Sequence, residues 1–386
     1  MAGREFPRRA SIVVIGGGVI GLSAAYHLAR AGVRDVVVVE RDEFGSGSTS
    51  KAAGGVRAQF SDEVNIALGL RSLRAYESFA TTMGQEIDLH QVGYLFLLDR
   101  TEHVEAFEHN VALQNDLGVP SRMIDPAEAK RLSPLISTEG LLAAAYSPID
   151  GHCTPESVVL GYATAARAAG ARLIRGCEVL AIERDGEAIT AVVTTEGTIS
   201  TEAVLCAAGA YSAAIGQMVG ETLPVEPLRR QILTTEPVPG LDPATPFTID
   251  FSSTFYFHRE GPGLLLGMSD PDETPGFKLG RSEAWMPRLG EAIAHRAPQV
   301  AEVGIASGWA GLYEMTPDHN ALIGELEEVP RFLYATGFSG HGFLMGPAVG
   351  EVVRDLYLGR KPVVDVSSLD ARRFARSETR PELNIV

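Results

Sequence analysis

The sequence predicts an α/β protein of two domains, one built on a parallel sheet and the other on a mostly antiparallel sheet. A strand, a glycine turn, a helix and a second strand follow one another in residues 11–40. A strand followed by a glycine-rich turn returns near residues 203 and 332, and residues 223–305 are richer in proline and aromatic residues. A chain of 386 residues, 45% of them hydrophobic, can fill two cores.

Residues 11–40 predict one strand–turn–helix–strand unit of a parallel sheet. The β-branched runs at 12–15 and 36–39 are typical of strands buried on both faces of a parallel sheet. The helix between them ends at Gly32. It begins on a GxGxxG motif, which permits a tight turn, a close ligand approach and close helix packing. The motif glycines are Gly16, Gly18 and Gly21.

This pattern predicts a dinucleotide site. The free N–H groups at the start of the helix would face a pyrophosphate. Glu40, at the end of the second strand, can accept hydrogen bonds from ribose hydroxyls and disfavours a 2′-phosphate. The alternative is a glycine-rich turn without a ligand, which leaves the acid at position 40 unexplained. The motif alone does not distinguish FAD from NAD.

Composition excludes several classes of partner. The net charge of −16 disfavours nucleic acid and anionic membrane surfaces. No apolar run approaches the ~18 residues of a membrane span, and the apolar N-terminal segment is typical of a strand, turn and helix, so we expect a cytoplasmic protein without a signal peptide. Cys153, Cys177 and Cys206 lie in no CxxC pair, which indicates reduced packing residues, and no metal-ligand spacing is visible.

Small residues dominate the stretch after Glu40. Residues 41–60 are rich in glycine, serine and alanine, a composition that lets a loop wrap closely around a ligand; a plain flexible connection is the alternative. Beyond it we expect a helix at 62–82, a strand at 94–98 and a helix at 102–117. Another helix begins at Asp125 and Pro126, which provide a cap and a first-turn proline.

The second half alternates between the two kinds of sheet. A helix at 155–169 and a strand at 172–174 precede a hairpin at 178–195. A buried strand at 203–207 ends in AAGAYS, whose small residues allow a second close approach to the dinucleotide.

Residues 223–305 then predict antiparallel strands with one helix at 283–297, a sheet that could cover a pocket. A strand at 332–335, the turn TGFSGHGFLMGP and a helix at 349–358 return to the first domain.

Five stretches carry a resemblance to a known family. The glycine motif with Glu40, GSGSTS, VLCAAGAYS, GLYEMTPDHNALIG and YATGFSGHGF follow in the order seen in the D-amino-acid oxidase superfamily of FAD-dependent amine and amino-acid oxidoreductases. The chain resembles most the branch of sarcosine oxidases, proline dehydrogenase β-subunits and glycine oxidases. The resemblance implies FAD rather than NAD.

The resemblance also implies how the domains divide. A discontinuous, Rossmann-like FAD-binding domain would comprise residues 1–90, 140–220 and 306–386. It would be interleaved with an α+β substrate domain, built on a mostly antiparallel β-sheet, at 91–139 and 221–305.

The same resemblance implies the cofactor contacts. The glycine motif, with Val19 and Ile20, would bind the pyrophosphate, and Glu40 the adenosine ribose. The adenine half would be completed by Arg41, Ser48, Thr49, Ser50 and Val179, with Ala208 and Gly209 nearby. Candidates at the flavin ring, where small residues or backbone suit a planar group, are Ala53, Gly54, Gly311, Gly340, His341, Gly342, Phe343 and Leu344.

Two positions depart from this branch. Monomeric sarcosine oxidases tether the flavin through a cysteine that aligns with Gly311, so we expect non-covalent FAD. They also place a lysine over the flavin, where this chain has Leu265. Loss of that charge favours slow reaction with oxygen and a partner redox protein as electron acceptor, although oxygen itself stays open.

Arg57 is the predicted carboxylate-binding residue, because its planar fork can pair with a carboxylate through two hydrogen bonds. A surface arginine or a contact to the FAD phosphates is the alternative. A second carboxylate-binding lysine of the branch aligns with Leu344, so the two-point clamp is incomplete.

Three further side chains are candidates for the substrate pocket. Tyr256 and Tyr313 align with pocket tyrosines of the branch, and the alternative is that both are core residues with satisfied hydroxyls. Strand alternation puts Tyr256 and His258 on one face. His341, between two glycines, is expected to donate or accept a hydrogen bond beside the flavin rather than to act as a base.

These residues predict an FAD-dependent oxidoreductase. It would transfer hydride from the α-carbon of a small amino acid or secondary amine to flavin N5, giving an imine that water hydrolyses. Two alternatives stay open. One is an enzyme of the same fold acting on a hydroxy acid or polyol phosphate, and the other is an FAD-binding subunit that serves chiefly to assemble a hetero-oligomer.

Overall fold

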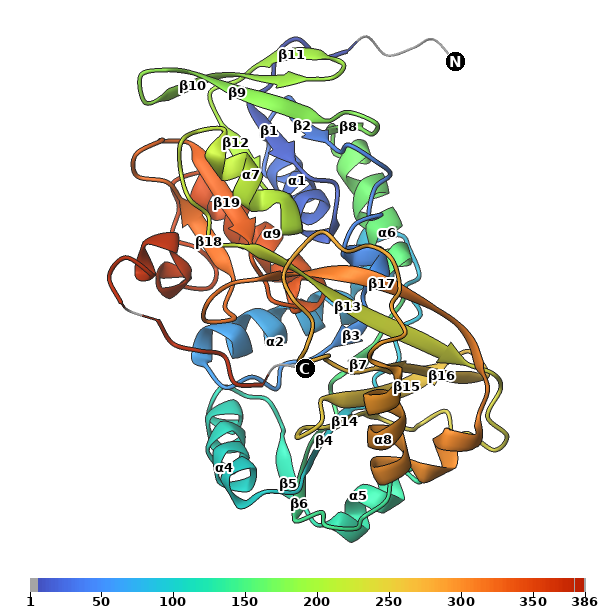
Figure 1. Ribbon diagram of the computed structural model, residues 1–386. Coiled ribbons are helices and arrows are strands. Elements are labelled where there is room, and N and C mark those ends of the chain that lie inside the picture. The colour runs from blue at the N-terminus through green and yellow to red at the C-terminus, as the bar shows by residue number, and fades with distance from the viewer. Residues whose placement is uncertain (1–5, 378, 385–386) are drawn as a thin grey trace.

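Two large sheets with helices packed on them organise the chain (Figure 1). The computed structural model describes residues 6–377 and 379–384. The six-stranded sheet has the order β18-β19-β12-β1-β2-β8, and the eight-stranded sheet has the order β17-β13-β16-β15-β14-β4-β6-β5. A three-stranded sheet, β11-β10-β9, and the pair β3-β7 complete the strands of this part of the chain. The predicted α/β fold class is confirmed.

The six-stranded sheet is parallel except at one edge. Its parallel strands are β1 (Ile12–Ile15), β2 (Val36–Val39), β8 (Arg172–Ile174), β12 (Val204–Cys206) and β19 (Phe332–Thr336), and β18 (Leu322–Glu325) pairs antiparallel with β19. Alternate residues of β1 enter two different cores, with Ile12 and Val14 on one face and Val13 and Ile15 on the other. This explains why the strand is apolar throughout, as predicted.

Helices cover both faces of this sheet. They are α1 (Val19–Arg30), α6 (Pro155–Ala168), α7 (Ser212–Gln217) and α9 (Gly342–Tyr357). The third motif glycine allows α1 to approach the turn, because a Cβ on Gly21 would lie 2.0 Å from the carbonyl oxygen of Gly16. The first strand, turn, helix and second strand therefore form as predicted.

The eight-stranded sheet is mostly antiparallel, with β14 and β4 as a parallel pair. Its strands are β4 (Tyr94–Leu98), β5 (Arg122–Ile124), β6 (Ala143–Ser147), β13 (Glu226–Thr235), β14 (Phe247–Asp250), β15 (Phe255–Glu260), β16 (Gly263–Gly267) and β17 (Ile305–Met315). One face packs against α5 (Pro126–Leu132) and α8 (Met286–Arg296), and α4 (Thr101–Asp116) packs against the other.

Side chains of β15 alternate between these two faces as predicted. Phe255 and Phe257 belong to the core beneath α8, and Tyr256 belongs to the opposite one. The face that carries Tyr256 is the one that meets the rest of the molecule.

Two strands bear on the proposed domain boundaries. Both β6 and β17 pair within the eight-stranded sheet, although residues 140–220 and 306–386 are assigned to the other domain. The boundaries therefore cut through this sheet, and the division remains a proposal. The small sheet of β9 (Val179–Asp185), β10 (Ala188–Thr194) and β11 (Gly197–Ser200) lies at one end of the molecule, and β3 (Gly55–Val56) pairs with β7 (Gly151–His152) near its middle (Figure 1).

Two predicted helices need correction. The helix expected at 62–82 is two helices, α2 (Glu63–Glu77) and α3 (Phe79–Met83). They meet at Ser78, whose hydroxyl donates to the carbonyls of residues 74 and 75, a bond that often accompanies a bend.

The helix expected at 349–358 starts earlier, at Gly342, and contains Pro347. Proline has no N–H to donate to the carbonyl four residues earlier. That carbonyl, on Phe343, accepts a 2.6 Å hydrogen bond from the Tyr76 hydroxyl instead.

The cysteines and the possibility of a membrane span were also addressed by the sequence. All three cysteines are buried and unpaired, as predicted. Within the described residues, we find no helix with the length and apolarity that a bilayer span requires.

Candidate functional site

A long cavity with a volume of about 500 Å³ connects the two sheets. One end lies at the carboxyl ends of β1 and β2, the edge at which parallel sheets bind ligands. The other end lies against the inner face of the eight-stranded sheet, where Ile232, Ile249 and Tyr256 form the wall. The cavity therefore joins the glycine turn to the inner face of the eight-stranded sheet.

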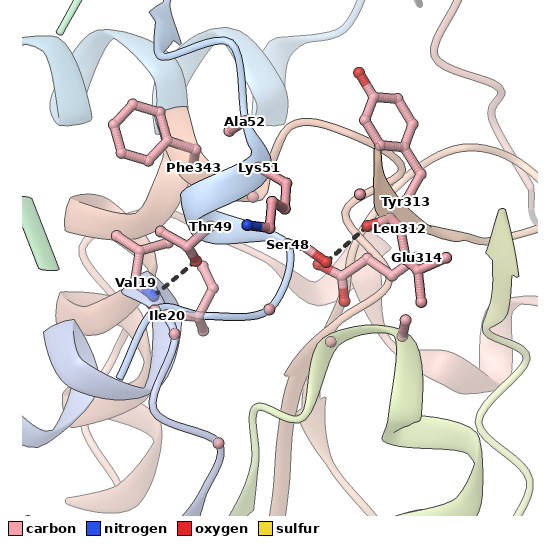
Figure 2. Close-up of a pocket in the computed structure, with 18 of the residues that line it drawn as sticks. Val19, Ile20, Ser48, Thr49, Lys51, Ala52, Leu312, Tyr313, Glu314 and Phe343 are labelled. Atoms are coloured by element: carbon pink, nitrogen blue, oxygen red, sulfur yellow. Dashed lines mark hydrogen bonds between the residues drawn. The ribbon is translucent and has the colours of Figure 1, made fainter. Parts of the chain in front are cut away.

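The start of α1 faces the first end of the cavity. Its N-cap, Gly18, has extended backbone and no side chain to cap the helix, and the first turn contains no acidic residue. The Val19 N–H donates to the Thr49 hydroxyl at 3.2 Å, which joins the glycine turn to the loop at 41–54 (Figure 2). Free N–H groups at a helix N-terminus favour an anion.

Glu40 holds the glycine turn in addition to lining the cavity. One carboxylate oxygen accepts from the N–H of Gly17 at 2.7 Å, and the other accepts from the N–H of Asp42 at 2.9 Å. A carboxylate has about four acceptor sites, so capacity remains for ribose hydroxyls.

A second uncapped helix, α9, starts at the middle of the cavity. His341 is its N-cap and makes no side-chain capping bond. The preceding Gly340 has φ of 100°, and a Cβ there would lie 2.4 Å from a ring carbon of Tyr313. The turn therefore needs glycine for both its conformation and its contact with Tyr313.

The loop at 41–54 is fixed to β17. The Ser48 hydroxyl donates to the carbonyl of Leu312 at 2.6 Å (Figure 2), and the Trp309 indole donates to the carbonyl of Lys51 at 3.1 Å. A Cβ on Gly311 would lie 2.5 Å from the Cβ of Lys51. The interpretation of this loop as a ligand-wrapping segment, rather than a flexible connection, agrees with these contacts.

Most of the sequence-predicted cofactor residues line this cavity. The exceptions are Gly21, which packs behind the turn, and Ser50, which lines a smaller second cavity. Leu265 also lines the second cavity, next to His258. The assignment of individual residues to parts of FAD remains a proposal.

Arg57 is buried, with 3% of its surface exposed, so the surface alternative is wrong. Its Nη2 donates to the carbonyl of Asn384 at 2.6 Å, its Nη1 donates to the carbonyl of Gln59, and its guanidinium lies 4.2 Å from the centroid of the Phe60 ring. Burial lowers the pKa of Arg57. Both terminal nitrogens already hold main-chain oxygens.

The predicted tyrosines meet at the same part of the cavity. Tyr256 from β15 and Tyr313 from β17 both line it, together with Tyr94, which sequence reasoning missed. Burial raises the pKa of all three hydroxyls, so they remain neutral. His319 takes positive φ in a turn outside the cavity, consistent with a structural role.

Five charged cavity residues were not predicted: Asp42, Lys51, Glu178, Arg230 and Glu314. Strand alternation does not single out Glu314, since it places neighbouring residues on opposite faces, and Figure 2 shows the side chains of Tyr313 and Glu314 pointing to opposite sides of β17. The Glu314 carboxylate accepts from the Thr336 hydroxyl and from the N–H of Gly337, both at 2.9 Å. Burial raises the pKa of Glu314. Glu314 therefore holds the turn that leads into α9.

Comparison with known proteins gives a family match over most of the chain. The model of the family described as FAD dependent oxidoreductase matches residues 11–356. The chain is 30% identical to the mitochondrial dimethylglycine dehydrogenase of Rattus norvegicus over 395 residues, which cover 97% of this chain and 46% of that protein. The chain thus spans about half the length of that relative.

Solved structures show the same similarity over whole chains. L-proline dehydrogenase from P. horikoshii has 35% sequence identity and a TM-score of 0.91, with 97% of this chain and 100% of that chain covered. Glycine oxidase from Geobacillus kaustophilus has 28% identity and a TM-score of 0.84, with 95% and 99% covered.

Proposed function

The chain belongs to the family described as FAD dependent oxidoreductase, and we propose that it oxidises the C–N bond of a small amino acid or secondary amine of the sarcosine, glycine or proline type, as the names of its relatives suggest. The observation that carries this proposal is the position of Tyr256 and Tyr313. They reach the same cavity that the glycine turn and the start of α9 line.

The residues present fit FAD. Two helix N-termini whose N-cap residues make no side-chain capping bond offer N–H groups to an anion, Glu40 offers an acceptor to a ribose, and glycine and alanine segments leave room for a planar ring. When bound, the flavin of FAD supplies the acceptor for the hydride. We propose that the residues named for each part of FAD in the sequence hold it, except Gly21 and Ser50.

The chain itself contributes binding and orientation rather than strong acid or base chemistry. Apolar side chains at 232, 247 and 249 exclude water and favour the uncharged form of an amine over its ammonium form. Neutral Tyr256 and Tyr313 can orient that amine so that its α-carbon faces the flavin. Such a pocket matches a reaction in which the amine loses a hydride without a protein base.

The electron acceptor is proposed to be a partner redox protein, with oxygen reacting slowly. Leu265 brings no charge, and it lines the second cavity rather than the main one. The cytoplasmic location expected from composition is also a proposal, since the rat relative is named as mitochondrial.

One observation favours the hydroxy-acid or polyol-phosphate alternative. Lys51 and Arg230 add basic groups to the cavity beside Arg57, and phosphates prefer several cations. Turnover with a dye as electron acceptor distinguishes the two functions. Formation of an aldehyde or keto acid, by hydrolysis of the imine, from sarcosine, glycine or proline supports amine oxidation. Product from glycerol phosphate or lactate alone contradicts it.

The other alternative is an FAD-binding subunit that serves chiefly to assemble a hetero-oligomer. Size-exclusion mass together with dye-linked turnover by the purified chain decides this point. A chain that turns over amines by itself excludes a purely structural role.

A further inference from the structure

Arg230 is a cavity arginine with few hydrogen bonds to the described part of the chain. It lies on β13 and is partly buried. Among residues 6–377 and 379–384, its buried Nε has no hydrogen-bond partner, and its Nη1 makes a long 3.3 Å hydrogen bond to the carbonyl of Arg229. Within the described residues it forms no ion pair with a carboxylate. An arginine has five N–H donors, so most of its donor capacity is open.

The neighbouring Arg229, by contrast, has partners for its guanidinium. Arg229 points to the other side of β13 and pairs with Glu273 at 2.6 Å, and it also donates to the carbonyl of Gly280 at 2.8 Å. Arg229 does not line the cavity. Alternation along one strand therefore places a paired arginine outside and an unpaired one inside.

Arg230 faces both pocket tyrosines. Its guanidinium carbon lies 5.3 Å from the centroid of the Tyr313 ring. Burial raises the pKa of Tyr256 and of Tyr313, and the positive charge of Arg230 acts on both hydroxyls in the opposite direction. In the strand register, Arg230 is opposite Gly311, a position expected beside the flavin. The cation therefore stands where a small substrate would lie between the tyrosines and the cofactor.

The other three basic residues of the cavity are less suited to bind a carboxylate. Arg41 pairs with Asp42 at 3.0 Å, and its guanidinium lies 3.7 Å from the centroid of the Tyr211 ring. Both terminal nitrogens of Arg57 already donate to main-chain carbonyls, and its Nη2 also contacts His341. A two-bond pairing with a carboxylate would have to displace or share these bonds. Lys51 is a point charge on the loop that packs against Gly311, and it cannot form a planar fork.

We propose that Arg230 binds the carboxylate of the substrate through its free guanidinium edge, beside Tyr256 and Tyr313, so that the substrate is a carboxylate-bearing amine rather than a simple amine. Arg57 then shapes the pocket and holds His341 instead of anchoring the ligand. This inference rests on the proposed function, since it names the substrate class of the same site.

The experiment uses 2-furoate, a ring carboxylate that cannot be dehydrogenated, and its amide 2-furamide as the uncharged control. Binding to the FAD-loaded protein is followed by the change in flavin absorption. The variants are Arg230→Gln and Arg230→Lys. Arg229→Gln is the matched control, because it removes the same charge from the same strand outside the cavity. Arg57→Lys and Lys51→Met test two of the other cavity cations, and FAD content and thermal midpoint verify folding.

Arg230→Gln should raise the furoate dissociation constant by about 10-fold or more while leaving furamide unchanged, and Arg230→Lys should recover part of the loss. Arg229→Gln should bind furoate as the unmodified protein does. The proposal is overturned if Arg230→Gln binds furoate normally, or if only Arg57→Lys or Lys51→Met loses it. It is also overturned if the unmodified protein binds furoate no better than furamide.

A second measurement separates this inference from the proposed function. FAD reduction by proline and by pyrrolidine, which lacks the carboxylate, is compared without oxygen in the unmodified and Arg230→Gln proteins. Selective loss of proline affinity in the variant supports the role of Arg230. Unchanged proline affinity defeats this inference and leaves amine oxidation intact, whereas an unmodified protein that no amine reduces defeats the proposed function itself.

Discussion

The Nη2 atom of Arg57 lies 3.2 Å from the Nε2 atom of His341. A guanidinium has no acceptor, so Nε2 of His341 must accept this hydrogen bond and the ring proton must be on Nδ1. Burial, followed by the charge of Arg57, places the pKa of His341 well below its ordinary value of 6.5. The imidazole is therefore neutral, and its basic nitrogen is occupied.

We therefore predict that His341 adds no titration to catalysis. Between about pH 6 and about pH 9, the rate of flavin reduction should follow only the deprotonation of the substrate ammonium. His341→Asn keeps an acceptor for Arg57 and should retain the same profile in stopped-flow reduction. A limb near the ordinary histidine pKa that disappears in this variant would show that His341 is the base.

Glu40 should contribute strongly to FAD affinity. Glu40→Ala removes the acceptor for the N–H of Gly17 and for the ribose, and a hydrogen bond to a charged group is worth roughly 1.5 to 3 kcal/mol. The FAD dissociation constant, measured by flavin fluorescence, should rise by about 10-fold or more. Glu43→Ala, which removes an exposed carboxylate from the same loop, is the control. Equal affinity in all three proteins would sink the assignment of the glycine turn.

Asp150 should make stability fall as pH rises. It accepts hydrogen bonds from the N–H of Ala58 and from the Gln59 amide, and burial raises its pKa from 3.8 to about 7. The folded protein then binds a proton that the unfolded chain has lost between these two values, so the stabilisation is complete below pH 3.8 and is lost as the pH approaches 7. Asp150→Asn cannot ionise, so its stability should fall less over this range.

Denaturant unfolding at several pH values measures this difference, which should be on the order of a few kcal/mol. Asp62, beside Glu382, also has its pKa raised to about 7, and it titrates in both proteins. The informative quantity is therefore the stability of the unmodified protein minus that of Asp150→Asn. A difference that stays constant from pH 4 to pH 7 would contradict the assignment.

FAD should leave the protein on denaturation. Gly311 has no side chain to form a tether, and the residue packed against it is Lys51. Acid precipitation should release the yellow colour into the supernatant, where FAD is identified by its mass. Flavin that remains with the washed precipitate would reveal a covalent bond.

Local patterns were sufficient for the parts of the fold that depend on neighbours in the chain. The unit from Ile12 to Val39 could be predicted because strand period, glycine spacing and helix length all lie within one segment. Tyr256 could be placed on the correct face of β15 for the same reason, since alternation needs only the strand itself.

The remaining features depend on contacts between distant segments. Nη2 of Arg57 donates to the carbonyl of Asn384, which is 327 residues away. No local sequence pattern could predict that this nitrogen already has a partner. The early start of α9 depends on Tyr76, whose hydroxyl replaces the hydrogen bond that Pro347 cannot make. Arg230 could not be singled out, because the difference between it and Arg229 lies in which one finds a carboxylate.

Anaerobic reduction of the bound flavin tests the central claim most directly. The purified protein is mixed without oxygen with sarcosine, glycine, proline, dimethylglycine, D-amino acids, lactate and glycerol phosphate, and the flavin absorption is followed. The account predicts that at least one amino acid or N-methylated amino acid bleaches the flavin, and that the hydroxy acid and the phosphate do not. Bleaching by lactate or glycerol phosphate with none by any amine would contradict it.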